Sequence, residues 1–460
     1  MSKTIQLILM GKIFGTDGIR GRANTYPMTG ELAFRVGQAA ALQFKKDKDR
    51  IKIIIGKDTR LSGYIFEYAL TSGLCSMGAD VYLVGPMPTP AIAHLTRSFA
   101  ADAGIVISAS HNPPEDNGIK FFDSEGYKLA DEIENQIEKN ALKGSLDCQD
   151  VPAHSVGKAF RIDDAQGRYI EYVKNSIGNM SLKGLKIVLD CSNGAAYKVA
   201  PLILSELRAD VITYGHKPDG SNINRECGAL CPDVLKAAVL GNKADCGIAL
   251  DGDADRVIMA DEKGNVIDGD HILAMCALEM KKRGRLSGDT IVGTVMSNKA
   301  FELAMKDNSI GFVRTKVGDR YVIEEMRKNS YSLGGETSGH IIFSDHITTG
   351  DGTLAALQVL RIMKESGKRL STLDKVFTSF PQIIENVRVR SKPELSSLPK
   401  VAKEIEKAES GLAKKGRVLV RYSGTENKCR VMVEGEDKDL IKRYADRIAD
   451  KVREEIGERK

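Results

Sequence analysis

Short apolar runs alternate with longer amphipathic segments along most of this 460-residue chain. Three of the apolar runs, at 51–56, 185–190 and 290–295, are each followed by a small polar loop and then by a segment with helical spacing. Strands that alternate with helices in this way are typical of α/β domains with parallel or mixed sheets. The pattern therefore predicts three related α/β domains, although the sequence similarity among the three segments is faint.

The end of the chain follows a different rhythm, which we interpret as strand, helix, two strands and helix. In the closing helix, apolar residues recur every four positions with charged residues between them, which gives one apolar stripe. The expected fold class is thus α/β, with three similar α/β domains with mixed sheets plus a smaller α+β C-terminal domain. We place the domains at residues 1–160, 161–260, 261–375 and 376–460. The stripe consists of Leu440, Tyr444, Ile448, Val452 and Ile456.

Composition narrows the range of partners. Hydrophobic residues make up 42% of the chain and charged residues 28%, which is enough apolar material for more than one core. The net charge is only +5, and basic and acidic residues are interleaved. We therefore expect no nucleic acid and no membrane partner, since an anionic small molecule needs only a local basic pocket.

Targeting and cysteine patterns point to a cytoplasmic protein. The apolar run at 5–10 is too short to span a membrane and lacks the cleavage site of a signal peptide. Eight cysteines are scattered along the chain, as expected in a reducing compartment. Cys227 and Cys231 lie close together in sequence, but no second Cys or His pair with ligand spacing accompanies them, so zinc is not expected.

The segment Ser108-Ala109-Ser110-His111-Asn112-Pro113 carries the first candidate chemistry. It lies between two strand-like runs at 104–107 and 119–122, with a turn signal at 117–118. A Ser-His pair in a tight loop at a strand end is well placed to expose a nucleophile. Taken alone, an ordinary polar turn explains this loop equally well.

A second motif, at 251–256, favours the interpretation of the serine loop as a nucleophile site over that of a polar turn. Asp251, Asp253 and Asp255 alternate along a loop between strand-like runs at 246–250 and 257–260. A calcium EF-hand is disfavoured because Arg256 stands where that loop needs glycine, and because the flanks resemble strands. Three carboxylates suit Mg²⁺, which completes its shell with phosphate oxygens and water. A solvated acidic turn would explain neither the spacing nor the flanking strands.

Two further loops offer groups for binding a substrate. The segment at 421–426, with Arg430 beyond it, combines guanidiniums, hydroxyls and a glycine, as a phosphate cradle does. The segment at 334–340 offers a carboxylate, hydroxyls and an imidazole that suit sugar recognition. Each loop is weak evidence by itself, and the second, taken alone, is more often structural.

Together and in this order, the four motifs resemble one superfamily, the α-D-phosphohexomutases. The resemblance runs from the segment at 13–21 to the segment at 431–435, which is nearly the whole chain. Within the superfamily the chain most resembles the bacterial phosphoglucosamine mutases. That narrower resemblance depends on a serine at position 108 and on the segments at 293–298 and 316–322.

The resemblance implies four domains around a central cleft and phosphoryl transfer between O6 and O1 of a glucosamine phosphate. Ser110 would carry the phosphoryl group, and it is preferred to Ser108 because it directly precedes His111 in the family motif. The reaction would pass through a bound 1,6-bisphosphate, with a hexosamine or hexose 1,6-bisphosphate as activator. One Mg²⁺ per active site would be held by Ser110, Asp251, Asp253 and Asp255.

The resemblance also assigns roles to the remaining candidates, and the expected partner is a small-molecule sugar phosphate. Arg20, His111, Lys120 and Arg256 would line the transfer site, with proton transfer left open between Lys120 and His111. A homodimer is favoured over a monomer. The sugar hydroxyls would contact Glu336, Ser338 and His340, and the non-reacting phosphate would be bound by Arg421, Ser423, Gly424, Thr425 and Arg430.

Departures from the family pattern leave alternatives open. Asn427, Ala254 and the Pro114-Glu115 pair replace residues that relatives usually have, without removing the nucleophile or a metal ligand. They put the sugar preference in doubt, so a phosphoglucomutase or phosphomannomutase is the nearest alternative. A magnesium-dependent phosphatase could use the same aspartates. A non-catalytic sugar-phosphate binding protein is disfavoured because the catalytic set is complete.

Overall fold

A computed structural model describes residues 12–458, with gaps at 16, 46–47, 144–150 and 424–426. The chain divides into two compact units, each described by itself below. The first extends up to Val295 and resumes at Val313–Asp374, and the second joins Met296–Phe312 to the segment from Lys375 onwards. Among the described residues, no helix is both long enough and apolar enough to cross a membrane.

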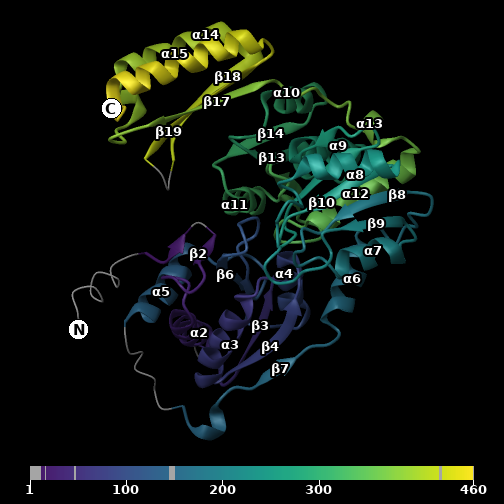
Figure 1. The fold of residues 1–460 in the computed structure, drawn as a ribbon, viewed down its shortest axis with the longest axis vertical. Helices are drawn as coiled ribbons and strands as arrows, with labels where there is room; N and C mark the ends of the chain where they lie inside the picture. The colour runs from purple at the N-terminus through teal and green to yellow at the C-terminus, as the bar shows by residue number, and fades with distance from the viewer. Residues whose placement is uncertain (1–11, 16, 46–47, 144–150, 424–426, 459–460) are drawn as a thin grey trace. The chain divides into compact units, whose positions relative to one another are not determined.

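The first unit begins with a seven-stranded mixed sheet. Its strand order is β1-β2-β6-β5-β3-β4-β7, and its central strands β3, β4 and β5 pair in parallel. Helices α2 and α3 pack against each other beside this sheet (Figure 1). The elements are β1 (Phe14–Gly15), β2 (Gly18–Arg22), α2 (Gly30–Lys45), β3 (Ile51–Lys57), α3 (Gly63–Ser76), β4 (Ala79–Pro86), α4 (Thr89–Ser98), β5 (Ala103–Ile107), β6 (Asp116–Asp123), α5 (Asp131–Leu142), η1 (Ala153–Ser155) and β7 (Ala159–Arg161).

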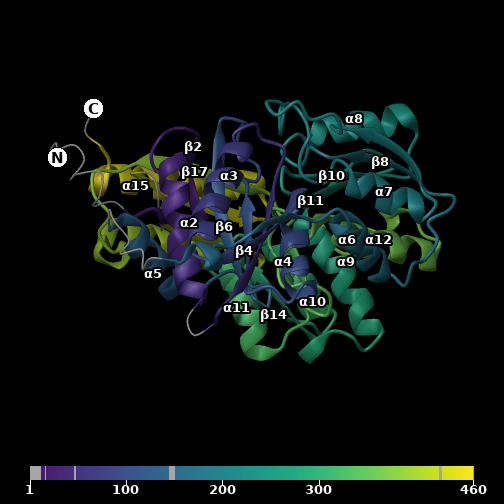
Figure 2. The same cartoon turned by 90° about the horizontal axis from the view of Figure 1, so that it is seen from below.

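A five-stranded sheet with the order β12-β11-β10-β8-β9 follows in the chain. Strand β8 pairs in parallel with β9 and β10, whereas β10 and β11 form an antiparallel hairpin. Helix α8 lies on one face of this sheet and α7 lies across from it (Figure 2). The elements are α6 (Ala165–Asn175), β8 (Lys186–Asp190), α7 (Val199–Glu206), β9 (Asp210–Tyr214), α8 (Pro232–Asn242), β10 (Cys246–Leu250), β11 (Val257–Asp261) and β12 (Val266–Ile267).

A third sheet repeats this plan with four strands in the order β14-β13-β15-β16. Again a parallel pair, β13 with β15, is extended by an antiparallel hairpin, β15 with β16. The elements are α9 (Gly269–Lys282), η2 (Ser287–Asp289), β13 (Thr290–Thr294), β14 (Gly311–Thr315), α11 (Asp319–Asn329), β15 (Leu333–Gly335), β16 (Ile341–Phe343), α12 (Gly352–Ser366) and α13 (Leu370–Leu373).

The second unit has one antiparallel sheet, in the order β17-β19-β18, with α14 and α15 packed together beside it (Figure 1). The predicted closing helix is present, but its buried stripe is shifted, because Ile441 and Ala445 are buried where Leu440 and Tyr444 are only half-buried. The elements are α10 (Lys299–Asp307), β17 (Gln382–Arg388), η3 (Leu395–Ser397), α14 (Pro399–Leu412), η4 (Ala413–Lys415), β18 (Gly416–Tyr422), β19 (Lys428–Gly435) and α15 (Lys438–Ile456).

These four sheets confirm the predicted fold class, three mixed α/β sheets and a smaller C-terminal sheet. The predicted domain boundaries near residues 160, 260 and 375 stay predictions. Strands β5 and β10 are buried along their whole length, as expected for strands covered on both faces. Both end in polar loops, and those loops meet at the candidate site.

Candidate active site

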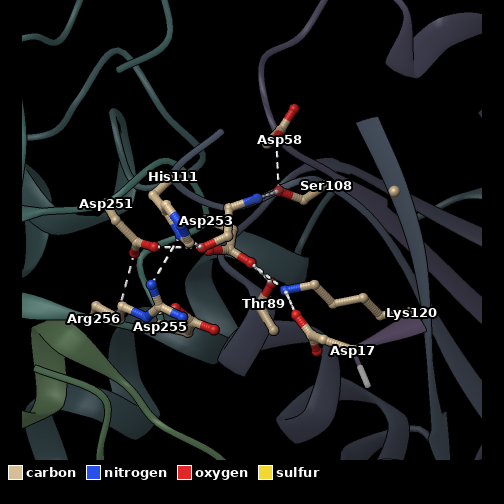
Figure 3. Close-up of polar contacts among 12 residues, drawn as sticks. Asp17, Asp58, Thr89, Ser108, His111, Lys120, Asp251, Asp253, Asp255 and Arg256 are labelled. Atoms are coloured by element: carbon tan, nitrogen blue, oxygen red, sulfur yellow. Dashed lines mark hydrogen bonds and ion pairs between the residues drawn. The ribbon is translucent and has the colours of Figure 1, made fainter. Parts of the chain in front are cut away.

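The loop after β5 turns tightly and buries Ser110. Its φ of +52° lies in the left-handed region, which is uncommon for a residue other than glycine. The Ser110 Oγ donates a hydrogen bond to Asp251 Oδ2 at 2.6 Å. Ser108 Oγ instead accepts from Ser110 N at 3.0 Å and donates to Asp58 Oδ2 at 2.6 Å, as Figure 3 shows. The geometry thus directs Ser110, and not Ser108, toward the acidic loop.

The three aspartates after β10 form one compact, buried cluster. Asp251, Asp253 and Asp255 each offer a carboxylate oxygen, and these oxygens all lie within 4.8 Å of one another. Within the described part of the chain, Asp253 Oδ1 and Asp255 Oδ1 are buried without a hydrogen-bond partner. Because buried polar atoms are costly to leave unpaired, these oxygens fit a hard divalent cation that takes oxygen ligands.

A close backbone approach lets the two loops meet. A Cβ on Gly252 would lie 2.5 Å from the carbonyl oxygen of Ser110, which is closer than real Cβ contacts. Only glycine therefore fits between the first two aspartates. Ala254, between the second and third aspartates, has a φ of +58° and is fully buried.

Two carboxyl groups of the cluster, those of Asp251 and Asp255, have pKa values shifted in opposite directions. Burial and the charges of Asp255 and Asp253 hold the pKa of Asp251 well above its usual range. Burial would also raise the pKa of Asp255, but the charges of His340, Lys120 and other neighbours hold it well below its usual range. A bound cation would therefore favour the ionised form of Asp251.

Lys120 links the aspartates to a second group of charges. Its Nζ lies 2.9 Å from Asp253 Oδ2 and 3.3 Å from Asp17 Oδ2. Burial would lower the pKa of Lys120, but Asp17 and Asp253 raise it overall, so the ammonium stays charged. Lys128 continues the chain of ion pairs, since it contacts Asp17 and lies 2.5 Å from Asp319 Oδ2.

His111 and Arg256 form the other edge of the site. Arg256 Nη1 donates to His111 Nδ1 at 2.8 Å, and that nitrogen lies 3.4 Å from Ser110 Oγ. Burial and the charges of Arg256 and Arg20 lower the pKa of His111, so its imidazole is neutral near pH 7. Because Nδ1 accepts a hydrogen bond from arginine, the ring proton lies on Nε2. Arg20 itself forms an ion pair with Asp17.

The predicted sugar-binding loop connects to the same network. Of its three candidates, Ser338 is exposed, whereas Glu336 and His340 are buried. Glu336 Oε1 accepts from the N–H of Gly318 at 3.0 Å. His340 Nδ1 lies 3.5 Å from Asp255 Oδ2, so this imidazole packs directly behind the aspartate cluster. Their contact with a sugar stays a prediction.

Four supporting groups were absent from the sequence prediction. Thr89 Oγ1 donates to Asp253 Oδ2 at 2.6 Å, and Asp58 accepts from Ser108. Asp17 and Lys128 anchor Lys120, as described above. A partial signal existed for two of them, because Asp58 lies two positions after the predicted strand at 51–56 and Asp17 lies in the motif at 13–21.

The second unit contains the predicted phosphate loop, although Gly424 and Thr425 lie outside the described residues. Arg421 and Arg430 face each other as partners across β18 and β19. With Lys428 they line a cavity of about 490 Å³. Burial and the charge of Arg430 lower the pKa of Arg421. Ser423 is buried beside them. Like charges across two strands are unfavourable, so this cavity suits an anion.

Family models match nearly the whole chain. They describe the phosphoglucomutase/phosphomannomutase alpha/beta/alpha domain I at residues 11–147, domain II at 167–264, domain III at 268–380 and the C-terminal domain at 385–451. A protein of Geobacter sp. (strain M21) named phosphoglucosamine mutase is 56% identical over 449 residues, which is 97% of this chain and 99% of that protein. One of the same name from Nitratidesulfovibrio vulgaris is 55% identical over 97% of this chain and 100% of its own.

Solved structures share the fold at low sequence identity. A phosphoglucomutase/phosphomannomutase family protein from Burkholderia thailandensis superposes with a TM-score of 0.77 at 22% identity, covering 96% of this chain and 97% of that one. The N-acetylphosphoglucosamine mutase of Aspergillus fumigatus, solved with GlcNAc-6P and magnesium, gives a TM-score of 0.69 at 19% identity and covers 99% of both chains.

Proposed function

Because the chain belongs to the phosphoglucomutase/phosphomannomutase family, we propose that it interconverts glucosamine 6-phosphate and glucosamine 1-phosphate. Relatives named phosphoglucosamine mutase at 55–56% identity over nearly the whole chain support this substrate. The observation that carries the mechanism is the 2.6 Å hydrogen bond from Ser110 Oγ to a buried three-carboxylate cluster. A serine hydroxyl beside a divalent-cation site is suited to carry a phosphoryl group.

In the proposed reaction, Ser110 carries the phosphoryl group in the active enzyme. The free hydroxyl of the sugar phosphate attacks this phosphorus, the bond from phosphorus to Ser110 Oγ breaks, and a 1,6-bisphosphate forms. The proton lost by the attacking hydroxyl is balanced by the one that Ser110 Oγ gains. The bisphosphate then reorients so that its other phosphate faces Ser110. Ser110 attacks that phosphate by the reverse steps. A hexosamine or hexose 1,6-bisphosphate loads Ser110 for the first cycle.

Asp251, Asp253 and Asp255, with a phosphoryl oxygen on Ser110, would hold Mg²⁺, which withdraws charge from the transferring group. Lys120 and Arg256 are charged and contact the same carboxylates, so they help to neutralise the phosphoryl oxygens. His111 is the neutral group beside Ser110 Oγ, but its Nδ1 already accepts a hydrogen bond from Arg256, so proton transfer stays open between His111 and Lys120.

Groups farther from the reacting atoms would hold the substrate. We assign the sugar hydroxyls to Glu336, Ser338 and His340. Binding energy from the non-reacting phosphate would orient the reactive end of the substrate. We assign that phosphate to Arg421, Ser423, Gly424, Thr425 and Arg430. Arg20 completes the transfer site through its ion pair with Asp17. We further propose a cytoplasmic homodimer with domains near the predicted boundaries.

The substrate is tested by measuring kcat/KM for glucosamine 6-phosphate, glucose 1-phosphate and mannose 1-phosphate, with Mg²⁺ and glucose 1,6-bisphosphate present. A preference for glucosamine of about tenfold or more, which is about 1.4 kcal/mol in transition-state binding, is expected. Equal or higher values with glucose or mannose would overturn the substrate while leaving the phosphoryl-transfer mechanism in place.

A further inference from the structure

Arg60 is the largest fully buried side chain in the described part of the chain, and no step above uses it. It follows β3 in the segment Asp58-Thr59-Arg60, and it contacts the backbone of the Ser110 loop. Burying a guanidinium is costly unless its charge is paired and its donors are bonded. The contacts of Arg60 therefore indicate what its burial achieves.

All three guanidinium nitrogens of Arg60 donate hydrogen bonds. The Nε donates to Asp58 Oδ2 at 2.8 Å, which pairs the charge. Nη2 donates to the carbonyl oxygens of Ser110 at 2.9 Å and Asn112 at 2.8 Å. Nη1 donates to the carbonyl oxygens of Pro113 and, at 3.0 Å, Asp116. A guanidinium has five N–H donors in a fixed planar fork, and here the fork spans four carbonyls of one loop.

The same network also holds the other side of Ser110. Asp58 accepts from Ser108 Oγ at 2.6 Å, and Ser108 Oγ accepts from Ser110 N at 3.0 Å. From the loop before α8, Asn224 Nδ2 donates to the carbonyl oxygens of Ser110 and Asn112, at 2.9 and 3.0 Å. Both backbone polar groups of Ser110 are therefore fixed, which stabilises its uncommon positive φ.

Fixing the carbonyl of Ser110 also fixes the next N–H. A trans peptide is planar, so the carbonyl oxygen of Ser110 and the N–H of His111 point in opposite directions. The oxygen points to Arg60 and Asn224, which leaves this N–H on the opposite edge of the peptide. Successive backbone N–H groups next to a left-handed residue are a common way to bind anions.

We propose that Arg60 is a positioning residue for phosphoryl transfer. It turns the carbonyls of the Ser110 loop toward itself, so that Ser110 Oγ faces the aspartates and the His111 N–H is available to a phosphoryl oxygen. The inference depends on the proposed role of Ser110 as the phosphoryl carrier. Changing Arg60 should therefore slow the transfer step and change the binding of the sugar phosphate little.

The test compares Arg60→Lys with wild type. Lysine keeps the positive charge beside Asp58 but lacks the planar fork, so it cannot span the four carbonyls. The rate at which glucose 1,6-bisphosphate phosphorylates Ser110 is followed by intact mass. We expect this rate to fall about a hundredfold, as a misplacement of about 1 Å does, with the KM for sugar phosphate changed less than about threefold.

Arg361→Lys is the matched control. Arg361 in α12 is also largely buried, at 9% exposure, but its Nε has no hydrogen-bond partner among the described residues. Its loading rate should stay within about twofold of wild type, which is under 0.5 kcal/mol. A rate for Arg60→Lys equal to that of this control would overturn the inference, as would a loss that appears only in KM.

A second variant guards against failure of Arg60→Lys to fold. Asn224→Gly removes the other donor to the Ser110 carbonyl while tolerating the φ of +59° at that position. It should slow loading by about tenfold, or 1.4 kcal/mol, with KM little changed, and an unchanged rate would contradict the inference. If wild type itself accepts no phosphoryl group at Ser110, the proposed function fails and the inference that depends on it fails with it, whereas equal loading rates in wild type and Arg60→Lys overturn the inference alone.

Discussion

Side chains of like charge cluster in two places in the molecule, and the two clusters differ in burial and in contacts. The acidic cluster of Asp251, Asp253 and Asp255 is fully buried, and cations such as Lys120 contact it directly. The basic cluster of Arg421, Lys428 and Arg430 lies across an antiparallel sheet and is half-buried. Removing a charged group from water costs more free energy than the repulsion between two like charges that stay in contact with water. Protein cations therefore compensate part of the charge of the acidic cluster, whereas the half-buried basic cluster is open enough to bind an anion from solution.

Substituting one acid gives the largest expected effect. Asp253→Asn removes the carboxylate 2.9 Å from Lys120 Nζ and leaves a buried ammonium with less compensation. We expect kcat/KM to fall at least about a thousandfold, and the free energy of unfolding to fall by about 3 kcal/mol. Steady-state kinetics and thermal unfolding measure both. Asp233→Asn, at an exposed position in α8, is the control. Unchanged stability in Asp253→Asn would remove the contrast between the two clusters.

Substituting one base should have the opposite effect on stability. Arg421→Met removes one charge from a cross-strand pair of like charges, so unfolding should become harder by up to about 1 kcal/mol. At the same time KM should rise about tenfold to a hundredfold, because a charge-assisted contact to the substrate phosphate is lost.

Arg417→Met, on the same strand, is the control for that substitution. Arg417 forms an ion pair with the buried Glu434, so its loss should destabilise the protein while leaving KM within about threefold, or about 0.7 kcal/mol. A decrease in stability for Arg421→Met would mean that protein partners already compensate the basic cluster.

The two clusters also differ in how far the sequence could predict them. Ser110 and the three aspartates stand in loops that directly follow apolar runs, and the structure brings their side chains together. Arg421 and Arg430 were both recognised, but their pairing depends on the register of β18 and β19. Local spacing predicts which residues end a strand, whereas register follows from packing of the whole sheet.

The supporting contacts show where sequence reasoning ends. Thr89 and Asp253 are bonded although they are 164 residues apart, and Arg60 bonds a loop 50 residues away. No local pattern specifies such pairs, because they depend on the order of strands within a sheet, as for Arg60, or on how separate sheets pack, as for Thr89. His340 was predicted to contact the sugar, and its nearest charged neighbours prove to be Asp255 and Asp319. The alternation of strands and helices, by contrast, predicted the fold class.

A buried acid outside both clusters, Glu134, tests the role of burial separately. Burial, opposed by Lys128, raises the pKa of Glu134 to about 7, although Arg320 Nη2 lies 3.0 Å away. Because the folded pKa exceeds the ordinary 4.5, the folded state binds the extra proton and loses stability as the pH rises from 4.5 to 7. Relative to Glu134→Gln, the Tm of wild type should fall by roughly 2 °C across this window. A constant difference in Tm would contradict the assignment.

The smallest expected effect isolates backbone strain within the acidic loop. Ala254 has a φ of +58°, which glycine adopts readily and alanine does not. Ala254→Gly changes no charge, so it should raise the free energy of unfolding by only about 0.5 kcal/mol, after the greater flexibility of the unfolded chain is included. A larger loss or gain would mean that backbone geometry, as well as charge, controls the stability of the acidic cluster.

The most direct test of the account follows one phosphoryl group. The enzyme is incubated with Mg²⁺ and radiolabelled glucose 1,6-bisphosphate, separated from the sugar, and then mixed with unlabelled glucosamine 6-phosphate. We expect the label to map to Ser110, to be absent in Ser110→Ala, and to pass to the sugar at a rate no slower than turnover. Label on another residue, or label that stays on Ser110 while turnover proceeds, would contradict it.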